Sequence, residues 1–207
     1  VVLGDAAEEL TQLVRKFNFP ITNTLMGIGG YPASDKQSLG WLGMHGSYES
    51  NMAMHHADLI VAIGARFDDR VTNNTSKFCP TAKIIHVDVD PSSVSKTVRA
   101  DVPIVGPASS VINEMISLVQ GQEIANPEAV SAWWQQINGW RAEREGKLYE
   151  PSKPGEVLKP QEVVEALCRV TRGEAFVTTD VGQHQMFAAQ YYKFEKPNRL
   201  ITSGGLG

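Results

Sequence analysis

The apolar residues of the chain follow two periods, one typical of amphipathic helices and one of buried strands. Asp5 is a candidate helix N-cap, because Glu8 follows it three residues later. Apolar side chains then recur at helical spacing, at Leu10, Leu13, Val14 and Phe17. This pattern predicts that the first element is an amphipathic helix.

Near-continuous apolar runs at residues 59–63 and 84–88 indicate strands that are buried on both faces. Shorter β-prone runs and helical patterns alternate with them, at residues 21–24, 48–56, 102–105 and 111–119. The alternation predicts an α/β fold with a parallel, doubly wound (Rossmann-like) sheet. Ligands of such sheets bind beyond the carboxyl ends of the strands, so the loops that follow the strands are the candidate sites.

The prolines and the glycine of residues 149–155 indicate a linker between two domains. We therefore expect a middle domain over residues 1–145, a linker over 146–158 and the start of a second α/β domain over 159–207. Both ends of the sequence look truncated. We expect the natural protein to extend in both directions and the first strand of the middle domain to precede Val1.

The composition is that of an ordinary folded protein: 207 residues, 42% hydrophobic, 20% charged, with a net charge of -4. The absence of a Lys/Arg cluster gives no reason to expect nucleic acid or a membrane surface as a partner. No apolar run is long enough to span a bilayer and no signal peptide opens the chain, so we expect a cytoplasmic protein. Cys79 and Cys168 are expected to be reduced structural thiols.

Two loops carry candidate chemistry in the first domain. Residues 40–46, GWLGMHG, place three glycines beside Met44 and His45, which suits close contact of the backbone with a ligand but equally a tight turn. Residues 64–70, GARFDDR, follow a predicted strand and gather two arginines with two aspartates. The arginines suit phosphate binding, and a self-neutralising set of salt bridges is the alternative.

Two further strand ends are less specific. Asp88 and Asp90 suit either ribose hydroxyls or the capping of a helix before Pro91. Residues 180–185, DVGQHQ, lie at a strand-to-helix junction that suits a phosphate group, or a simple capped helix. The glycines near residue 27 have the wrong order for GxGxxG, which weakens a nicotinamide-binding interpretation.

The chain resembles the acetohydroxyacid synthase (acetolactate synthase) catalytic subunits, a family of thiamine-diphosphate enzymes. The resemblance covers nearly the whole chain and rests on six motifs in order: TLMGIG, GMHG, GARFDDRVT, HVDVDP, TTDVGQHQM and SGGLG. The motifs GARFDDR and DVGQHQM are the most specific of these.

The resemblance implies an enzyme that condenses two pyruvates, or pyruvate and 2-ketobutyrate, with release of CO2, in branched-chain amino acid synthesis. It implies thiamine diphosphate with Mg²⁺, and FAD that is not needed for net redox chemistry. It also implies a homodimer or homotetramer of the full-length chain. The sequence does not decide between the two second substrates, nor whether a regulatory small subunit binds.

Site residues are carried over by position. The implied FAD contacts are Thr24, Leu25, Leu42, Gly43, Met44, His45, Gly46, Gly64, Ala65, Arg66, Phe67, Asp68, Asp88 and Val89. The implied substrate channel includes Met44, Asp69 and Arg70. The implied thiamine diphosphate contacts are Gln183, His184 and Gly207.

The chain departs from the family at several points. Members usually carry Gly-Asp where this chain has Gly106-Pro107, and proline removes one N–H donor for the flavin. The N-terminal domain, whose glutamate activates the thiamine ring, and the later GDGS-to-Asn stretch that binds Mg²⁺ are both outside this sequence. We therefore expect no catalytic residue and no metal ligand within these residues, and an inactive chain when it is isolated.

Two other functions remain open. One is a sister thiamine enzyme, such as glyoxylate carboligase or a pyruvate oxidase. The other is a stand-alone module that binds FAD or another nucleotide without catalysis. Gln183, His184 and the glycine loop at residues 204–207 argue against the module, since they suit a thiamine domain that continues.

Overall fold

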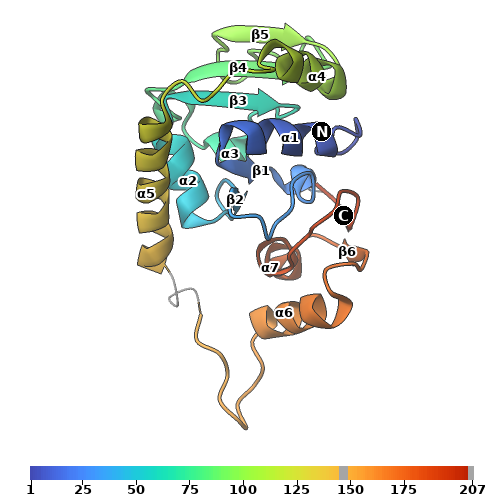
Figure 1. Cartoon of the computed structure of the whole chain (residues 1–207). Helices are drawn as coiled ribbons and strands as arrows, with labels where there is room; N and C mark the ends of the chain where they lie inside the picture. Colours follow the sequence, from blue (N-terminus) through green and yellow to red (C-terminus); the bar gives the residue numbers. More distant parts are fainter. Residues whose placement is uncertain (145–148, 205–207) are drawn as a thin grey trace.

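The computed structural model describes residues 1–144 and 149–204. Helices and strands alternate along most of the chain (Figure 1). The strands are β1 (Ile21–Asn23), β2 (Ser38–Trp41), β3 (Leu59–Ile63), β4 (Lys83–Asp88), β5 (Val102–Val105), β6 (Val177–Thr179) and β7 (Leu200–Thr202). The helices are α1 (Ala7–Phe17), α2 (Tyr48–His56), α3 (Asp69–Thr72), α4 (Ala108–Leu118), α5 (Pro127–Arg144), α6 (Pro160–Thr171) and α7 (Gln183–Tyr191), with 3-10 turns η1 (Leu25–Gly27) and η2 (Thr75–Lys77).

All strand pairings in the described part of the chain are parallel. β1 pairs with β2, β3, β4 and β5 form one sheet in that order, and β6 pairs with β7. The predicted α/β fold with parallel sheets is therefore confirmed, although the described strands form three short sheets. Figure 1 shows α6 and β6 at the opposite end of the molecule from the sheet of β3, β4 and β5, with α7 between α6 and β2. We call α6, α7, β6 and β7 the second unit, and residues 1–144 the first unit.

Strand β3 is not buried on both faces, contrary to the prediction. Leu59 and Val61 are 46% and 38% exposed, whereas Ala62 is buried. β3 is an edge strand of its sheet among the described residues, so it has a strand neighbour on one side only. The apolar run was correctly predicted as a strand, but the run alone does not reveal which faces are covered.

The prediction that Asp5 caps α1 was wrong. Asp5 adopts a φ of 45°, and the helix begins at Ala7 with no side-chain hydrogen bond at its cap. The preceding residues form a tight turn in which the amide of Ala6 donates to the carbonyl of Val1 at 3.1 Å.

Strand β2 was not predicted from the sequence. Its last residues, Gly40 and Trp41, overlap the segment that was expected to be a loop.

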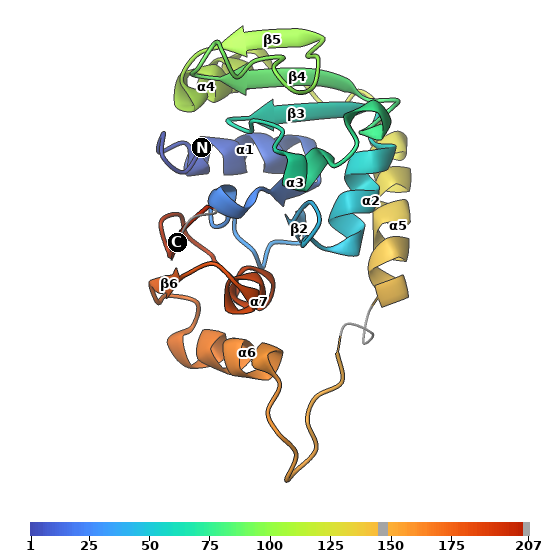
Figure 2. The ribbon, with the colours of Figure 1, turned by 180° about the vertical axis from the view of Figure 1, so that it is seen from behind.

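Three apolar clusters lie in the first unit, one of them formed by Ala62, Phe67 and Ile84. α1 and α4 pack through Leu10, Val14 and Ile112. α2 and α5 lie side by side (Figure 2) and pack through a cluster that includes Ile137 and Trp140. None of the helices described here has the length and apolar character needed to cross a bilayer.

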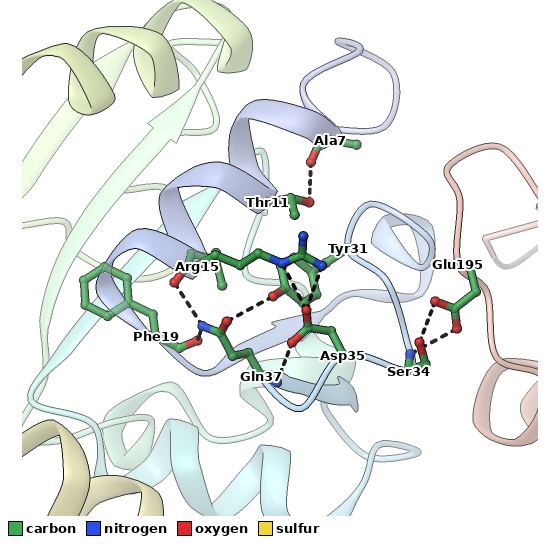
Figure 3. Close-up of polar contacts among 10 residues, drawn as sticks. Ala7, Thr11, Arg15, Phe19, Tyr31, Ser34, Asp35, Gln37 and Glu195 are labelled. Atoms are coloured by element: carbon green, nitrogen blue, oxygen red, sulfur yellow. Dashed lines mark hydrogen bonds and ion pairs between the residues drawn. The ribbon is translucent and has the colours of Figure 1, made fainter. Parts of the chain in front are cut away.

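A polar network fixes the segment that follows η1 (Figure 3). The side-chain amide of Gln37, which is 3% exposed, donates to the carbonyls of Val14 and Phe19 at 2.9 and 2.8 Å. Arg15 and Asp35 form an ion pair at 2.8 Å. Burial opposes ionisation of Asp35, but the hydrogen bonds from the Gln37 amide and Arg15 outweigh it and lower the pKa of the carboxyl. The segment is therefore held firmly against α1.

The same segment contacts the second unit. The backbone amide and the hydroxyl of Ser34 donate to the carboxylate of Glu195, at 3.0 and 2.8 Å (Figure 3). The amide of Ala33 donates to the carbonyl of Phe194 at 3.2 Å. Phe194 itself is fully buried. These contacts join the two units at a point where the first unit is rigid.

Candidate functional site

The residues implied as FAD contacts follow the carboxyl ends of four parallel strands. They come after β1, β2, β3 and β4, which end at residues 23, 41, 63 and 88. Thr24 and Leu25 lie at the start of η1 and are half-buried. The strand-to-loop transitions thus have the placement that ligand-binding loops take in parallel sheets.

The loop of residues 42–46 is clamped by Asn51 of α2. The amide of Gly43 donates to Asn51 Oδ1 at 3.0 Å, and Asn51 Nδ2 donates back to the Gly43 carbonyl at 2.9 Å. Gly43 has a φ of 97°, and a β-carbon on it would lie 2.6 Å from the carbonyl oxygen of Arg70. Glycine is therefore required by the turn itself. Asn51 was not among the predicted site residues, because nothing in the sequence marks an asparagine inside a helix as a loop clamp.

The structure brings together the three residues implied for the substrate channel. The amide of Met44 donates to the carbonyl of Arg70 at 2.9 Å, and the Arg70 guanidinium lies 3.8 Å from the Met44 sulfur. Asp69 begins α3, directly before Arg70. The side chain of Met44 is 61% exposed. The apolar side chain of Met44, the anionic side chain of Asp69 and the cationic side chain of Arg70 are therefore all exposed in one region of the surface.

Some of the charged side chains in the loop of residues 64–68 form an ion pair with each other. Arg66 forms an ion pair with Asp68, as the alternative interpretation proposed, yet the Arg66 side chain remains 78% exposed. Asp68 also caps α3, since its Oδ1 accepts from the Arg70 amide at 3.0 Å. That hydrogen bond, with one from Asp69, lowers the pKa of the Asp68 carboxyl. Arg66 therefore keeps an exposed guanidinium that can reach an anionic ligand.

Phe67 lies in the same loop but turns its side chain inward. Its ring is 7% exposed and meets the rings of Phe78 and His86 edge to face, at 5.9 and 5.0 Å. Its φ is 54°, which is uncommon for a residue with a β-carbon. Phe67 can thus offer a ligand its backbone only, while Ala65 is half-buried and Gly64 is exposed.

At the end of β4, the carboxylates of Asp88 and Asp90 accept hydrogen bonds from the turn that follows the strand. Asp88 Oδ1 accepts from the amide of Asp90 at 2.9 Å. Asp90 accepts from the amide and the hydroxyl of Ser92, and these bonds lower the pKa of its carboxyl. Asp90 therefore caps a turn, whereas Asp88 is half-buried and Val89 is exposed at the strand end. The amide of Gly106 donates to the Asp88 carbonyl at 3.0 Å, and Pro107 is the N-cap of α4.

The residues implied for thiamine diphosphate lie in the first turn of α7. Gln183 and His184 are exposed, and no side chain among the described residues caps this helix after Gly182. Gln185 anchors the turn by donating to the Thr202 hydroxyl at 2.7 Å and to the Ser203 carbonyl at 2.9 Å. Backbone amides at such a helix start suit a diphosphate group. Gly207 lies outside the described residues.

Two family models match this chain. The model for the thiamine pyrophosphate enzyme central domain matches residues 1–115. The model for the C-terminal thiamine pyrophosphate binding domain of these enzymes matches residues 180–207. The chain belongs to the thiamine pyrophosphate enzyme family.

Within that family the chain is similar to acetolactate synthase large subunits. It is 50% identical to the Haemophilus influenzae large subunit over 206 residues, which are 100% of this chain and 35% of the relative. It is 53% identical to the isozyme 3 large subunit of Escherichia coli over 201 residues, 97% of this chain and 34% of the relative. An acetolactate synthase of Mycobacterium bovis is 41% identical over 207 residues, 100% of this chain and 33% of the relative. The chain thus spans about a third of the length of the curated relatives it matches.

Proposed function

We propose that the chain is part of an acetolactate synthase, which condenses two pyruvates, or pyruvate and 2-ketobutyrate, to acetohydroxyacids with release of CO2. The reaction would serve the synthesis of valine, leucine and isoleucine. The observation that carries the proposal is the similarity to acetolactate synthase large subunits, which extends along the whole chain. The domains 1–145 and 159–207, joined by the linker 146–158, are part of this proposal.

The first turn of α7 is the proposed place for the diphosphate of thiamine diphosphate. Gln183 and His184 would add side-chain hydrogen bonds to those of the helix amides, and Gly207 would contact the pyrimidine side. The uncapped, exposed helix start fits a doubly charged group. When bound, thiamine diphosphate supplies the carbanion chemistry that joins the two ketoacids. The proposed Mg²⁺ ligands lie outside this chain.

The strand-end loops of the first unit are the proposed FAD site. The exposed Arg66 guanidinium would pair with the flavin diphosphate, and Gly64, where a β-carbon would lie 3.6 Å from the Val1 nitrogen, would let the backbone approach the cofactor. Gly43 and Gly46 would contribute backbone contacts, while their missing β-carbons make room for the turn itself. Thr24, Leu25, Leu42, His45, Ala65, Phe67, Asp68, Asp88 and Val89 would complete the contacts. Met44, Asp69 and Arg70 would face incoming ketoacid, with Arg70 attracting its carboxylate.

The full-length protein is proposed to work as a homodimer or homotetramer in the cytoplasm. Its relatives are large subunits, which supports a regulatory small subunit as a further partner. Both cysteines are free and Cys79 is buried, which suits a reducing compartment.

Product analysis tests the proposed reaction. The natural full-length protein is supplied with ¹³C-pyruvate, thiamine diphosphate, Mg²⁺ and FAD, and the products are followed by NMR. We expect acetolactate and CO2. Acetyl phosphate or acetate with reduction of an electron acceptor would indicate a pyruvate oxidase. In a parallel sample supplied with glyoxylate in place of pyruvate, tartronate semialdehyde would indicate the carboligase. No product in either sample, with FAD still bound, would favour the non-catalytic module.

A further inference from the structure

One side chain of the second unit reaches the proposed FAD site. Gln190 Nε2 donates to the carbonyl oxygen of His45 at 2.6 Å. Gln190 lies in the last turn of α7, the helix whose first turn contains Gln183 and His184. A single nine-residue helix and one hydrogen bond therefore connect the two proposed cofactor sites.

The loop at the FAD end of this connection is held by several contacts. Its neighbours Gly43 and Met44 are held by Asn51 and by the carbonyl of Arg70. The His45 ring also packs against Trp41, with ring centroids 5.8 Å apart. A displacement of the His45 carbonyl would therefore disturb the whole loop.

The helix at the other end is held by contacts near both of its ends. Gln185 binds Thr202 and Ser203 at the start of α7, and α7 packs along α6. Tyr192, directly after the helix, is buried and its hydroxyl lies 2.7 Å from that of Thr171. Gln190 and the first turn belong to one continuous helix, so a displacement at Gln190 would also displace the first turn.

The two units are docked independently of Gln190. Ser34 binds Glu195 with two hydrogen bonds, and Gly29 packs against the backbone of Lys196. None of these residues belongs to either proposed cofactor site. Removing the Gln190 side chain should therefore leave the docking intact.

We propose that Gln190 is a positioning residue that couples the two cofactor sites, so that FAD bound at residues 42–46 raises the affinity of α7 for thiamine diphosphate. The inference rests on the proposed function, since it takes the two cofactors from it. The coupling is reciprocal, because linkage requires each ligand to affect the other equally. One neutral hydrogen bond limits the effect to at most about tenfold.

The test measures dissociation constants rather than activity. The natural full-length protein is stripped of cofactors, and thiamine diphosphate with Mg²⁺ is titrated calorimetrically with and without saturating FAD. In the unaltered protein we expect FAD to tighten thiamine diphosphate binding a few-fold. In Gln190→Ala we expect the ratio of the thiamine diphosphate dissociation constant without FAD to that with FAD to fall to about 1. Gln190→Met, which keeps nearly the same side-chain length but lacks the donor and adds no charge, should behave the same way.

Ser34→Ala is the matched control, because it weakens the docking contact without touching the connection. We expect it to keep the ratio of the unaltered protein. A ratio of 1 in the unaltered protein, an undiminished ratio in both Gln190 variants, or an equal loss in Ser34→Ala would each overturn the coupling alone. Failure of the unaltered protein to bind FAD would overturn the proposed function together with the coupling.

Discussion

Gly29 lies directly against the backbone of Lys196, where the two units meet. Gly29 has a φ of 85°, and a β-carbon on it would lie 2.4 Å from the carbonyl oxygen of Lys196. The oxygen belongs to the backbone, so it cannot move aside as a flexible side chain would. Any other residue at position 29 must therefore displace backbone at this contact.

Gly29→Ala is expected to destabilise the natural protein by about 2 kcal/mol or more, the sum of left-handed backbone strain and the clash. Gly40→Ala is the matched control, since Gly40 has a φ of 82° but no atom within 4 Å of the new β-carbon. It should lose only about 1 kcal/mol. Urea unfolding followed by tryptophan fluorescence measures both, and equal losses would contradict the contact with Lys196.

Gln37→Ala is expected to lower the free energy of unfolding by about 1–3 kcal/mol, because it removes the donor of the part-buried Phe19 carbonyl and one donor of the buried Val14 carbonyl, which also accepts from the Phe19 amide. Gln122 also donates to a carbonyl, that of Leu118 at 3.2 Å, but it is exposed. Gln122→Ala should therefore change the free energy of unfolding by no more than about 0.5 kcal/mol. Comparable decreases in the free energy of unfolding of the two variants would show that the hydrogen bonds of Gln37 do not stabilise the segment that follows η1.

Cys79 is expected to resist alkylation in the folded protein. Burial raises the pKa of its thiol to about 12, so at pH 8 only about one thiol in 10,000 is ionised, against about one in four at the ordinary pKa. Only the thiolate reacts. Peptide mapping after iodoacetamide treatment should find Cys79 modified in denaturant and almost unmodified in native protein. Rapid native alkylation would contradict the buried position.

His86 should tolerate an apolar ring but not truncation. It is 1% exposed, and neither ring nitrogen has a hydrogen-bond partner within residues 1–144 and 149–204. His86→Phe should therefore keep the stability to within about 1 kcal/mol, since the edge-to-face contact with Phe67 is retained. His86→Ala should lose about 3 kcal/mol. A loss in His86→Phe as large as in His86→Ala would mean that a ring nitrogen is hydrogen-bonded in solution.

Much of the fold could be predicted because local pattern decides it. The helix predicted at residues 48–56 and the strand predicted at 102–105 have those bounds in the structure, and Pro160 begins α6 as its fixed φ favours. The prediction that Asp5 caps the first helix failed because an N-cap needs particular backbone angles. The turn that begins at Val1 gives Asp5 different angles. β2 was missed because it is four residues long, contains Gly40 and gains its pairing only from β1, far away in sequence.

The site shows the same division. Motif order located the strand-end loops, and the contact between Met44 and Arg70 agrees with their joint assignment to one channel. The clamp by Asn51 and the contact of Gln190 with His45 could not be predicted. Both depend on tertiary packing that brings helix residues against a loop, and neither leaves a periodicity or spacing in the sequence. Whether these loops bind FAD stays a prediction.

The most direct measurement compares two variants of the natural full-length protein, Arg66→Ala and Gln183→Ala, by titrating each with FAD alone and with thiamine diphosphate and Mg²⁺ alone. We expect Arg66→Ala to weaken FAD binding about tenfold or more and to leave thiamine diphosphate binding unchanged, because a charge-assisted contact is lost at one site only. Gln183→Ala should do the reverse. Unchanged FAD affinity in Arg66→Ala together with unchanged thiamine diphosphate affinity in Gln183→Ala would contradict the placement of the two cofactors on this chain.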